Sequence, residues 1–181
     1  VPSSPWHVPV DSPIPQVHVL SQAETSLVIS NAGSGYSRWR EFALTRWHAD
    51  ATLDQWGTWI YVQDRESGAL WSATCQPMGC ASDGQASDHQ EVLFYPHKVE
   101  FQRSDHGISL RTGITVSTDG VEIRRVNILN ESDHPRQLKL TSYGEVVLAN
   151  QADDRRHPAF NKLFIESEYL PKQNALLFRR R

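Results

Sequence analysis

The sequence predicts an all-β protein, folded as an antiparallel β-sandwich. Apolar and polar residues alternate over short runs, most clearly from Ile108 to Val116, which is the pattern of a strand with one buried face. Turn sequences such as "DRESG", "SDHG" and "STDG" separate these runs. We find no apolar stripe of convincing length with the helical period of about 3.6 residues. At 181 residues, the chain is long enough for one domain of two stacked sheets.

The proline-rich N-terminus differs from this pattern. Residues 1–16, "VPSSPWHVPVDSPIPQ", contain five prolines, which remove backbone donors and favour an extended chain. We therefore expect residues 1–16 to be an extended linker or a strap along a neighbour, and residues 17–181 to form the sandwich. Strands are expected at residues 27–30, 58–62, 69–74, 91–95, 99–103, 108–116, 121–129, 137–148, 163–169 and 175–178.

Two segments depart from simple alternation. "SRWREFALTRWHADA" fits a short helix about as well as strands, because its Trp, Phe and Thr residues are common in strands. In "VEIRRVNIL", the apolar residues change parity between Ile123 and Val126. One inserted residue produces such a slip, so we expect a β-bulge at Arg124 or Arg125.

The composition argues against several kinds of partner. A formal net charge of -3 without a clustered run of Lys and Arg offers no electrostatic footprint for nucleic acid or an anionic membrane. No apolar run approaches the roughly 20 residues that cross a bilayer, so no direct membrane insertion is expected. Cys75 and Cys80, in "CQPMGC", lack the second pair of ligands that a structural zinc site needs. We expect two free thiols in a reducing compartment, and the alternative is a disulfide.

The stretch from Asn31 to Tyr61 concentrates aromatic and charged side chains. These are Tyr36, Trp39, Trp47, Trp56 and Trp59, with Arg38, Arg46, Asp50 and Asp54. Sugar sites combine flat aromatic rings for the apolar ring face with planar groups for the hydroxyls. The alternative is that the aromatics fill the core while Arg and Asp side chains satisfy one another. The loop "NAGSGYS" lacks the Lys-Ser/Thr and the long helix of a phosphate cradle, so a phosphate site there is the weaker hypothesis.

Three long motifs resemble one protein family. "SNAGSGYSRWREFALTRWHADATLDQWGTWIYVQDRESGALWSAT", "VEIRRVNILNESDHPRQLKLTSYGEVVLA" and "HPAFNKLFIESEYLP" closely resemble the N-terminal β-sandwich domain of the cyclic β-1,2-glucan synthase and cellobiose or chitobiose phosphorylase family, which is glycoside hydrolase family 94, formerly glycosyltransferase family 36. The resemblance implies a supersandwich, similar to galactose mutarotase, that precedes a helical linker and an (α/α)6 catalytic barrel. It also implies that the chain is a truncated piece of a longer bacterial protein, with an unpaired edge strand near Phe178.

The resemblance further implies an edge that faces a carbohydrate or the barrel. Its residues are Gly33, Ser34, Gly35, Tyr36, Ser37, Arg38 and Trp39, followed by Arg46, Trp47 and Asp54. Ser34 stands where many relatives have glycine. Such enzymes hold their catalytic aspartate and inorganic phosphate in the barrel, so we expect no catalytic residue, metal or cofactor in this chain. For the same reason Asp50 and Asp54 are not expected to be a glycosidase carboxylate pair, although such enzymes use two carboxylates.

We therefore expect a non-catalytic, carbohydrate-associated module of a cyclic β-1,2-glucan synthase or β-glucoside phosphorylase. Its expected partners are the barrel, β-glucan or a gluco-oligosaccharide, and a second copy in a homodimer. The resemblance places it on the cytoplasmic side of an inner-membrane-associated parent.

Two alternative functions remain open. The first is a mutarotase-like aldose epimerase with Glu145 as base and His157 as acid. Against it, Glu145 more simply ion-pairs with an arginine and His157 caps a loop. The second is a purely structural or dimerisation module that contacts no sugar.

Overall fold

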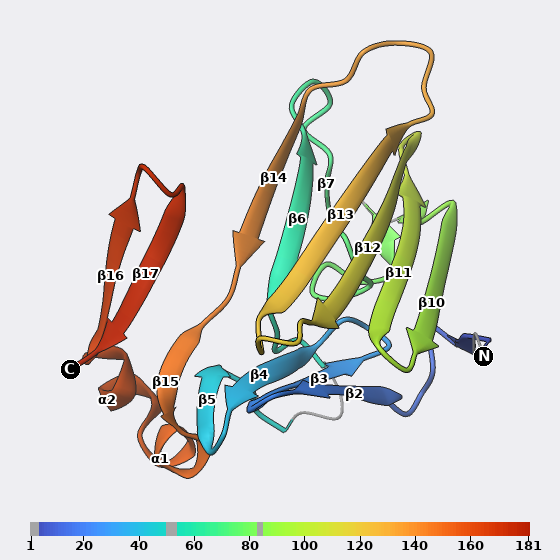
Figure 1. Ribbon diagram of the computed structural model, residues 1–181. Coiled ribbons are helices and arrows are strands. Elements are labelled where there is room, and N and C mark those ends of the chain that lie inside the picture. The colour runs from blue at the N-terminus through green and yellow to red at the C-terminus, as the bar shows by residue number, and fades with distance from the viewer. Residues whose placement is uncertain (1–3, 50–53, 83–84) are drawn as a thin grey trace.

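The computed structural model describes residues 4–49, 54–82 and 85–181, and most of its elements are strands (Figure 1). In chain order they are β1 (Trp6–Val8), β2 (Val17–Gln22), β3 (Thr25–Ser30), β4 (Gly35–Trp39), β5 (Phe42–Thr45), β6 (Trp59–Asp64), β7 (Leu70–Ser72), β8 (Ala81–Ser82), β9 (Gln85–Ala86), β10 (His89–Tyr95), β11 (Lys98–Asp105), β12 (Ile108–Val116), β13 (Glu122–Asn130), β14 (Leu138–Tyr143), β15 (Val146–Asn150), α1 (Gln151–Arg156), α2 (Pro158–Lys162), β16 (Ile165–Leu170) and β17 (Ala175–Arg180). Neighbouring strands pair antiparallel, which confirms the predicted fold class.

The sheets form two layers (Figure 1). One layer is the five-stranded sheet β1-β10-β11-β12-β13. The other layer contains a second five-stranded sheet, β15-β5-β4-β3-β2, and the three-stranded sheet β14-β6-β7. The C-terminal hairpin β16-β17 stands to one side, beyond β15 and the two helices, in Figure 1.

The two larger hydrophobic clusters of the described residues lie between the layers. The first comprises Val8, Leu20, Leu27, Ile29, Val92, Phe94, Val99, Phe101 and Ile114. The second comprises Val62, Ala69, Trp71, Ala73, Ile108 and Leu110. β12 therefore contributes to both clusters through the residues whose alternation predicted it. Burying a side chain of this size favours folding by about 1.5 to 3 kcal/mol relative to exposure. β12 therefore stabilises the packing of both sheets of the second layer.

Each run predicted as a strand contains a strand, and two details differ. Residues 137–148 break into β14 and β15 at Gly144 and Glu145, where the chain passes from one sheet to the other. The ambiguous segment "SRWREFALTRWHADA" contains the end of β4 and the whole of β5, with Arg38 opposite Ala43 in their hairpin, and its described residues contain no helix. In the N-terminal segment, β1 pairs with β10 as an edge strand.

The short helices α1 and α2 were not predicted. They contain 6 and 5 residues, too few to show an apolar stripe. Their signal lies in the caps: the Asn150 side chain accepts a hydrogen bond from the Ala152 backbone N–H at 2.9 Å, and Pro158 begins α2.

The expected β-bulge at Arg124 or Arg125 is wrong. β13 pairs with β12 in unbroken register along its whole length. Arg124 instead points inward and donates to a Glu122 oxygen at 2.5 Å and to the Thr58 carbonyl at 2.7 Å, while Ile123 lies on the outer face with 42% exposure. Arg124 occupies an inward position and finds its hydrogen-bond partners inside the sandwich. The apolar residues before and after it therefore differ in parity although no residue is inserted.

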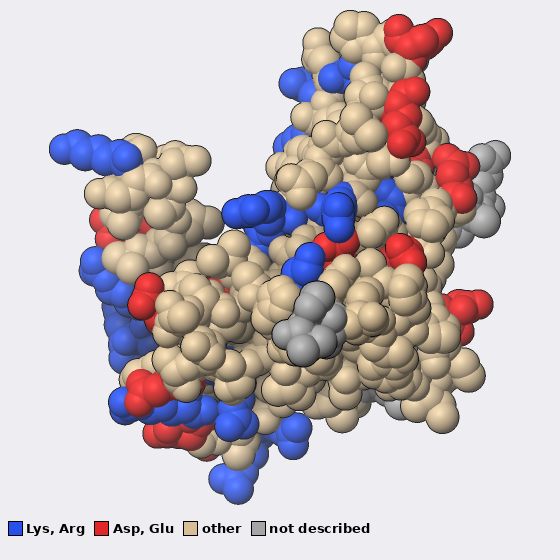
Figure 2. All heavy atoms as spheres, turned by 45° about the vertical axis from the view of Figure 1, so that its right-hand side comes forward, with Lys and Arg blue, Asp and Glu red and all other residues tan. Residues whose placement is uncertain are grey.

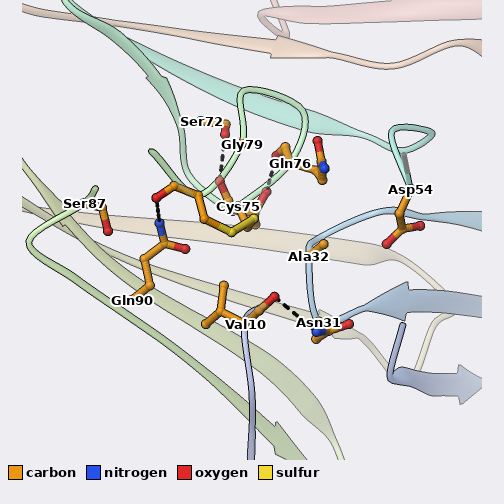
Figure 3. Close-up of a disulfide and its surroundings, with 12 residues drawn as sticks. Val10, Asn31, Ala32, Asp54, Ser72, Cys75, Gln76, Gly79, Ser87 and Gln90 are labelled. Carbon is orange, nitrogen blue, oxygen red and sulfur yellow. Dashed lines mark hydrogen bonds between the residues drawn. A yellow bond between two sulfur atoms is a disulfide. The ribbon is translucent and has the colours of Figure 1, made fainter. Parts of the chain in front are cut away.

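The expectation of free thiols is also wrong, because Cys75 and Cys80 form a disulfide (Figure 3). Their Cα atoms are 4.4 Å apart, within the range that disulfides require. The buried Arg103 guanidinium donates to the Thr74 carbonyl at 2.8 Å and to the Gly79 carbonyl at 3.3 Å. The loop closes around this arginine from β11, a long-range contact that cysteine spacing cannot reveal.

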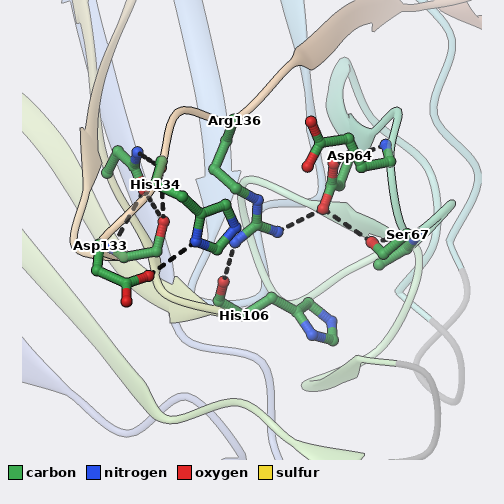
Figure 4. Close-up of polar contacts among 10 residues, drawn as sticks. Asp64, Ser67, His106, Asp133, His134 and Arg136 are labelled. Atoms are coloured by element: carbon green, nitrogen blue, oxygen red, sulfur yellow. Dashed lines mark hydrogen bonds and ion pairs between the residues drawn. The ribbon is translucent and has the colours of Figure 1, made fainter.

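A buried ion pair connects three separate loops (Figure 4). Asp64, at the end of β6, accepts hydrogen bonds from the Arg136 guanidinium, from Ser67 Oγ at 2.8 Å and from the Glu66 backbone N–H at 3.0 Å. Arg136 also donates to the His106 carbonyl, in the β11–β12 turn, at 3.0 Å. This network fixes β6 and the segment before β14 against the opposite layer.

Candidate functional site

A small cavity lies where β5, β6, β14 and β15 meet. Its lining residues are Arg46, Gln55, Trp56, Gly57, Trp59, Tyr143 and Glu145, and its volume is about 120 Å³. Arg46 follows β5, and β14 pairs with β6 so that Tyr143 lies opposite Trp59. The backbone N–H of Arg46 donates to the Glu145 carbonyl at 2.9 Å, which closes the junction. Aromatic rings and planar polar groups therefore share one concave surface.

Arg46 is the electrostatic centre of this surface. Its side chain is 2% exposed, and its Nε and Nη2 atoms donate to the two carboxylate oxygens of Asp154 at 2.9 and 2.8 Å. Its Nη1 atom donates to Glu145 at 2.6 Å. Hydrogen bonding to Asp154 is the main cause that raises the pKa of Arg46. A buried guanidinium needs such partners on every side, so Asp154, which lies in α1, completes the site from a helix that was not predicted.

Glu145 remains an ionised acceptor at the cavity wall. Burial would raise the pKa of Glu145, but the charges and hydrogen bonds of Lys162 and Arg46 outweigh it and lower that pKa. Lys162 Nζ lies 3.1 Å from Glu145 Oε2, and the Tyr143 hydroxyl donates to Glu145 at 3.3 Å. Burial, and then the charge of Glu145, raise the pKa of Tyr143, so this phenol keeps its proton. The Tyr143 residue is 50% exposed and offers its ring beside a fixed carboxylate.

The geometry disfavours the mutarotase alternative. A general base works best with a pKa near the operating pH, whereas the pKa of Glu145 is lowered by its cationic neighbours. His157 is exposed and lies between α1 and α2, where its backbone N–H donates to the Asp153 carbonyl at 3.1 Å. Among the described residues, no hydrogen bond joins His157 to Glu145. The simpler interpretation, in which Glu145 ion-pairs with an arginine, is confirmed.

The glycine-rich loop around Gly33, Ser34 and Gly35 holds Trp56, one of the residues that line the cavity. Gly33 and Ser34 are buried, and Ser34 Oγ donates to the Trp56 carbonyl at 2.6 Å. The Gly35 backbone N–H donates to the same carbonyl at 2.8 Å. A Cβ on Gly35 would lie 1.9 Å from the Val28 carbonyl oxygen, and the residue has a φ of +149°, so only glycine fits there. The loop therefore positions Trp56.

The rest of the predicted edge divides between two faces of a strand. Tyr36 packs against Trp47, with ring centroids 5.5 Å apart. Ser37 points inward to the Glu122 carboxylate. Trp39 is 39% exposed and stacks at 6.4 Å on Phe42. Because side chains alternate along β4, Tyr36 and Trp39 lie on opposite faces.

Arg38 and Asp54 do not line the cavity. Arg38 is exposed on β4, on the same face as Tyr36. Asp54 accepts a hydrogen bond from Ser30 Oγ at 2.6 Å and lies near the disulfide loop (Figure 3). Asp50 lies outside the described residues. Of the predicted edge, Arg46 is the residue that lines the cavity.

Three lining residues were missed as ligand groups. Gln55 is flanked by the aromatic set, and Tyr143 and Glu145 share the motif "TSYGEVVL", in which Glu145 was expected to be a base or the partner of an arginine. The signal available in the sequence was that all three lie in the motifs that resemble the family.

The described residues contain neither a cluster that could hold a metal ion nor a helix that could span a membrane. No group of three or more His, Cys, Asp or Glu residues is placed to hold a metal ion within them. No helix in the same part of the chain is both long and apolar enough to span a membrane.

Comparison with known proteins identifies relatives over most of the chain. Residues 7–181 match the family model of the glycosyl hydrolase 94 supersandwich domain. The chain is 33% identical over 163 residues to the cyclic beta-(1,2)-glucan synthase NdvB of Rhizobium meliloti (strain 1021), which covers 88% of this chain and 6% of that protein. It is 30% identical over 152 residues to the N,N'-diacetylchitobiose phosphorylase of Vibrio proteolyticus, covering 81% of this chain and 19% of the relative. The corresponding phosphorylase of Vibrio furnissii is 28% identical over 163 residues, with 88% and 20% covered. The chain thus spans a fifth or less of these relatives.

Proposed function

The chain belongs to the glycosyl hydrolase 94 supersandwich domain family, and from this premise we propose that it is a non-catalytic module that contacts β-glucan and forms one wall of its parent protein's sugar site. The parent would be a cyclic β-1,2-glucan synthase or a β-glucoside phosphorylase. Its catalytic barrel, a separate part of the parent, would supply the acid, the inorganic phosphate and the other walls.

The cavity at Arg46 is the observation that carries this proposal. It combines the exposed Tyr143 ring with the ionised Glu145 and with Gln55, the groups that stack on a sugar face and bind its hydroxyls. Its volume of about 120 Å³ is well below that of a pocket which encloses a small ligand on its own, about 300 Å³ and more. One wall of a composite site fits these dimensions better than a complete site.

The partners and location follow as parts of the same proposal. The module would pack on the barrel, with homodimer formation as a further contact, and would need no cofactor of its own. We place it on the cytoplasmic side of an inner-membrane-associated parent. The structure has a Cys75–Cys80 disulfide, and disulfides are rare in the cytosol, so the state of this pair in intact cells tests the placement. Acid-quenched alkylation followed by mass spectrometry would measure it, and a fully oxidised pair would contradict a cytoplasmic location.

A titration with β-1,2-linked gluco-oligosaccharides, followed by tryptophan fluorescence, tests the sugar contact. We expect saturable binding that Tyr143→Ala weakens about tenfold, because one stacking ring is lost. Trp39→Ala is the matched control, since Trp39 stacks on Phe42 outside the cavity.

The opposite pattern in the two variants would locate the sugar at the β4 edge, which the sequence favoured. No saturable change with the unmodified chain up to millimolar sugar would overturn the contact and leave the purely structural function.

A further inference from the structure

A second, larger cavity lies on the outer face of the β1-β10-β11-β12-β13 sheet, away from the Arg46 cavity. Its volume is about 360 Å³, within the range of small-molecule pockets, about 300 to 1,000 Å³. Its lining residues are His97, Lys98, Glu100, Arg111, Gly113, Ile114, Thr115, Ile123, Arg125 and Asn127.

Gly113 creates this cavity. It sits in the middle of β12, opposite Glu100 of β11 and Arg125 of β13, so the three residues form one row across the sheet. A Cβ built on Gly113 meets no atom within 4 Å, and the residue has no positive φ that would require glycine. A glycine inside a strand weakens it and often marks a place where another molecule approaches the backbone. Here the glycine leaves a hole on the outer face between the cross-strand neighbours Glu100 and Arg125.

The walls of the cavity carry an excess of positive charge. Glu100 is 3% exposed and accepts hydrogen bonds from Lys98 Nζ at 2.7 Å, Gln102 Nε2 at 3.0 Å and Arg111 Nε at 2.6 Å. Burial would raise the pKa of Glu100, but these donors outweigh it and lower that pKa. Glu100 is therefore occupied by protein groups and acts as an anchor for Lys98 and Arg111.

The anchored cations keep donors for a ligand. Arg111 uses Nε for Glu100, and among the described residues its two terminal nitrogens bind no acceptor. Its side chain is 59% exposed. Arg125 lies across the hole and, within the same described part of the chain, pairs with no carboxylate. The face that Figure 2 turns towards the viewer shows basic side chains gathered in a band with acidic ones beside them.

We propose that this cavity binds a small organic anion, with its phosphate or carboxylate group held between Arg111, Arg125 and Lys98 over Gly113. Asn127 also lines the cavity and offers hydrogen bonds to a hydroxylated body such as a sugar ring; Thr115 Oγ1 donates to the His97 carbonyl at 2.6 Å and can accept one more. The site is separate from the sugar wall at Arg46, so the ligand, the residues and the outcome differ from those of the proposed function.

Isothermal titration calorimetry at low ionic strength, where exposed charges act most strongly, tests this site. The probes are glucose 6-phosphate, glucuronate and uncharged glucose. We expect saturable binding of at least one of the two acids and none of glucose. Binding of one acid identifies phosphate or carboxylate as the recognised group, and binding of both shows that the charge itself is recognised. Amide chemical-shift changes centred on Gly113 would place the ligand in the cavity.

Three variants and one control decide between this site and general charge attraction. Gly113→Val fills the hole with a side chain that suits a strand, so it should abolish binding while the melting temperature is kept or raised. Arg111→Gln and Arg125→Gln should each weaken binding about tenfold, the loss expected from one charge-assisted hydrogen bond. Arg38→Gln, on another sheet, should leave binding unchanged.

Either of two results would overturn the proposal: no saturable binding of either acid to the unmodified chain, or affinities that all the variants retain. If Gly113→Val fails to fold, the two arginine variants decide the outcome.

Discussion

At the scale of single residues, this protein buries several charges and supplies each with partners. Arg46 forms ion pairs with Asp154 and Glu145. Arg103 forms one with Asp105, with Nε 2.5 Å from Oδ2. Removing one member of such a group leaves the other charged and buried, which costs more than the pair itself contributes. These residues therefore determine both the stability of the fold and the shape of its cavities.

Asp64 provides a direct test of this principle. Its backbone hydrogen bond from Glu66, and next the Arg136 guanidinium, hold the pKa of Asp64 well below its ordinary value. Because the folded-state pKa is lowered, the stabilisation is present above the unfolded pKa of about 3.9 and is lost as the pH falls below it. We expect Asp64→Asn to lower the free energy of unfolding at pH 7 by about 2 kcal/mol.

Urea denaturation of both proteins at pH 7 and at pH 3 measures this effect. The difference between the proteins should shrink at pH 3, because acid weakens the same interaction in the unmodified chain. A difference that stays constant between the two pH values would show that Asp64 acts through packing and not through its charge.

At the scale of elements, β4 depends on close approach to β3. Gly35→Ala would place a Cβ 1.9 Å from the Val28 carbonyl oxygen, at a backbone φ of +149°. Since backbone cannot yield as a flexible side chain does, we expect a loss of about 3 kcal/mol or more in the free energy of unfolding. Denaturant unfolding provides the measurement.

Gly113→Ala is the matched control, because it lies in a strand with open space around the new Cβ. It should be neutral or stabilise by about 0.5 to 1 kcal/mol. Equal effects of the two substitutions would show that the approach of β4 to β3 is not limiting.

At the scale of the whole molecule, stability is distributed unevenly. β11 and β12 lie inside a five-stranded sheet and bury apolar residues in the core. Within the described residues, β16 and β17 form a two-stranded sheet of their own, and Tyr169 and Leu176 are 57% and 62% exposed. An isolated hairpin is marginally stable at best. Parts of a protein with few buried contacts open most easily.

Hydrogen exchange measured by mass spectrometry tests this distribution. Amides of β16 and β17 should exchange orders of magnitude faster than those of β11 and β12 in the isolated chain, although both pairs are hydrogen-bonded. Comparable protection of the hairpin would indicate that it packs on a neighbour, as in a dimer.

Local patterns in the sequence predict the strands, and its motifs point to the family. Alternation in β12 and the turns around it predicted antiparallel strands, because a period of two is a local property of side chains on a pleated chain. It also identified Arg46 as a candidate, and the motif resemblance pointed to the supersandwich that the family match shows.

Which faces of the strands meet depends on how the sheets pack in three dimensions. Tyr36 and Trp39, expected on one edge, lie on opposite faces of β4. Arg46 binds Asp154, which lies more than a hundred residues away along the chain. The hole at Gly113 depends on the residues that pairing places on either side of it, Glu100 and Arg125, and the Cys75–Cys80 loop closes around Arg103 of β11. The local pattern predicts whether a side chain points inward or outward on its strand. Long-range pairing and packing between the sheets decide what that residue faces.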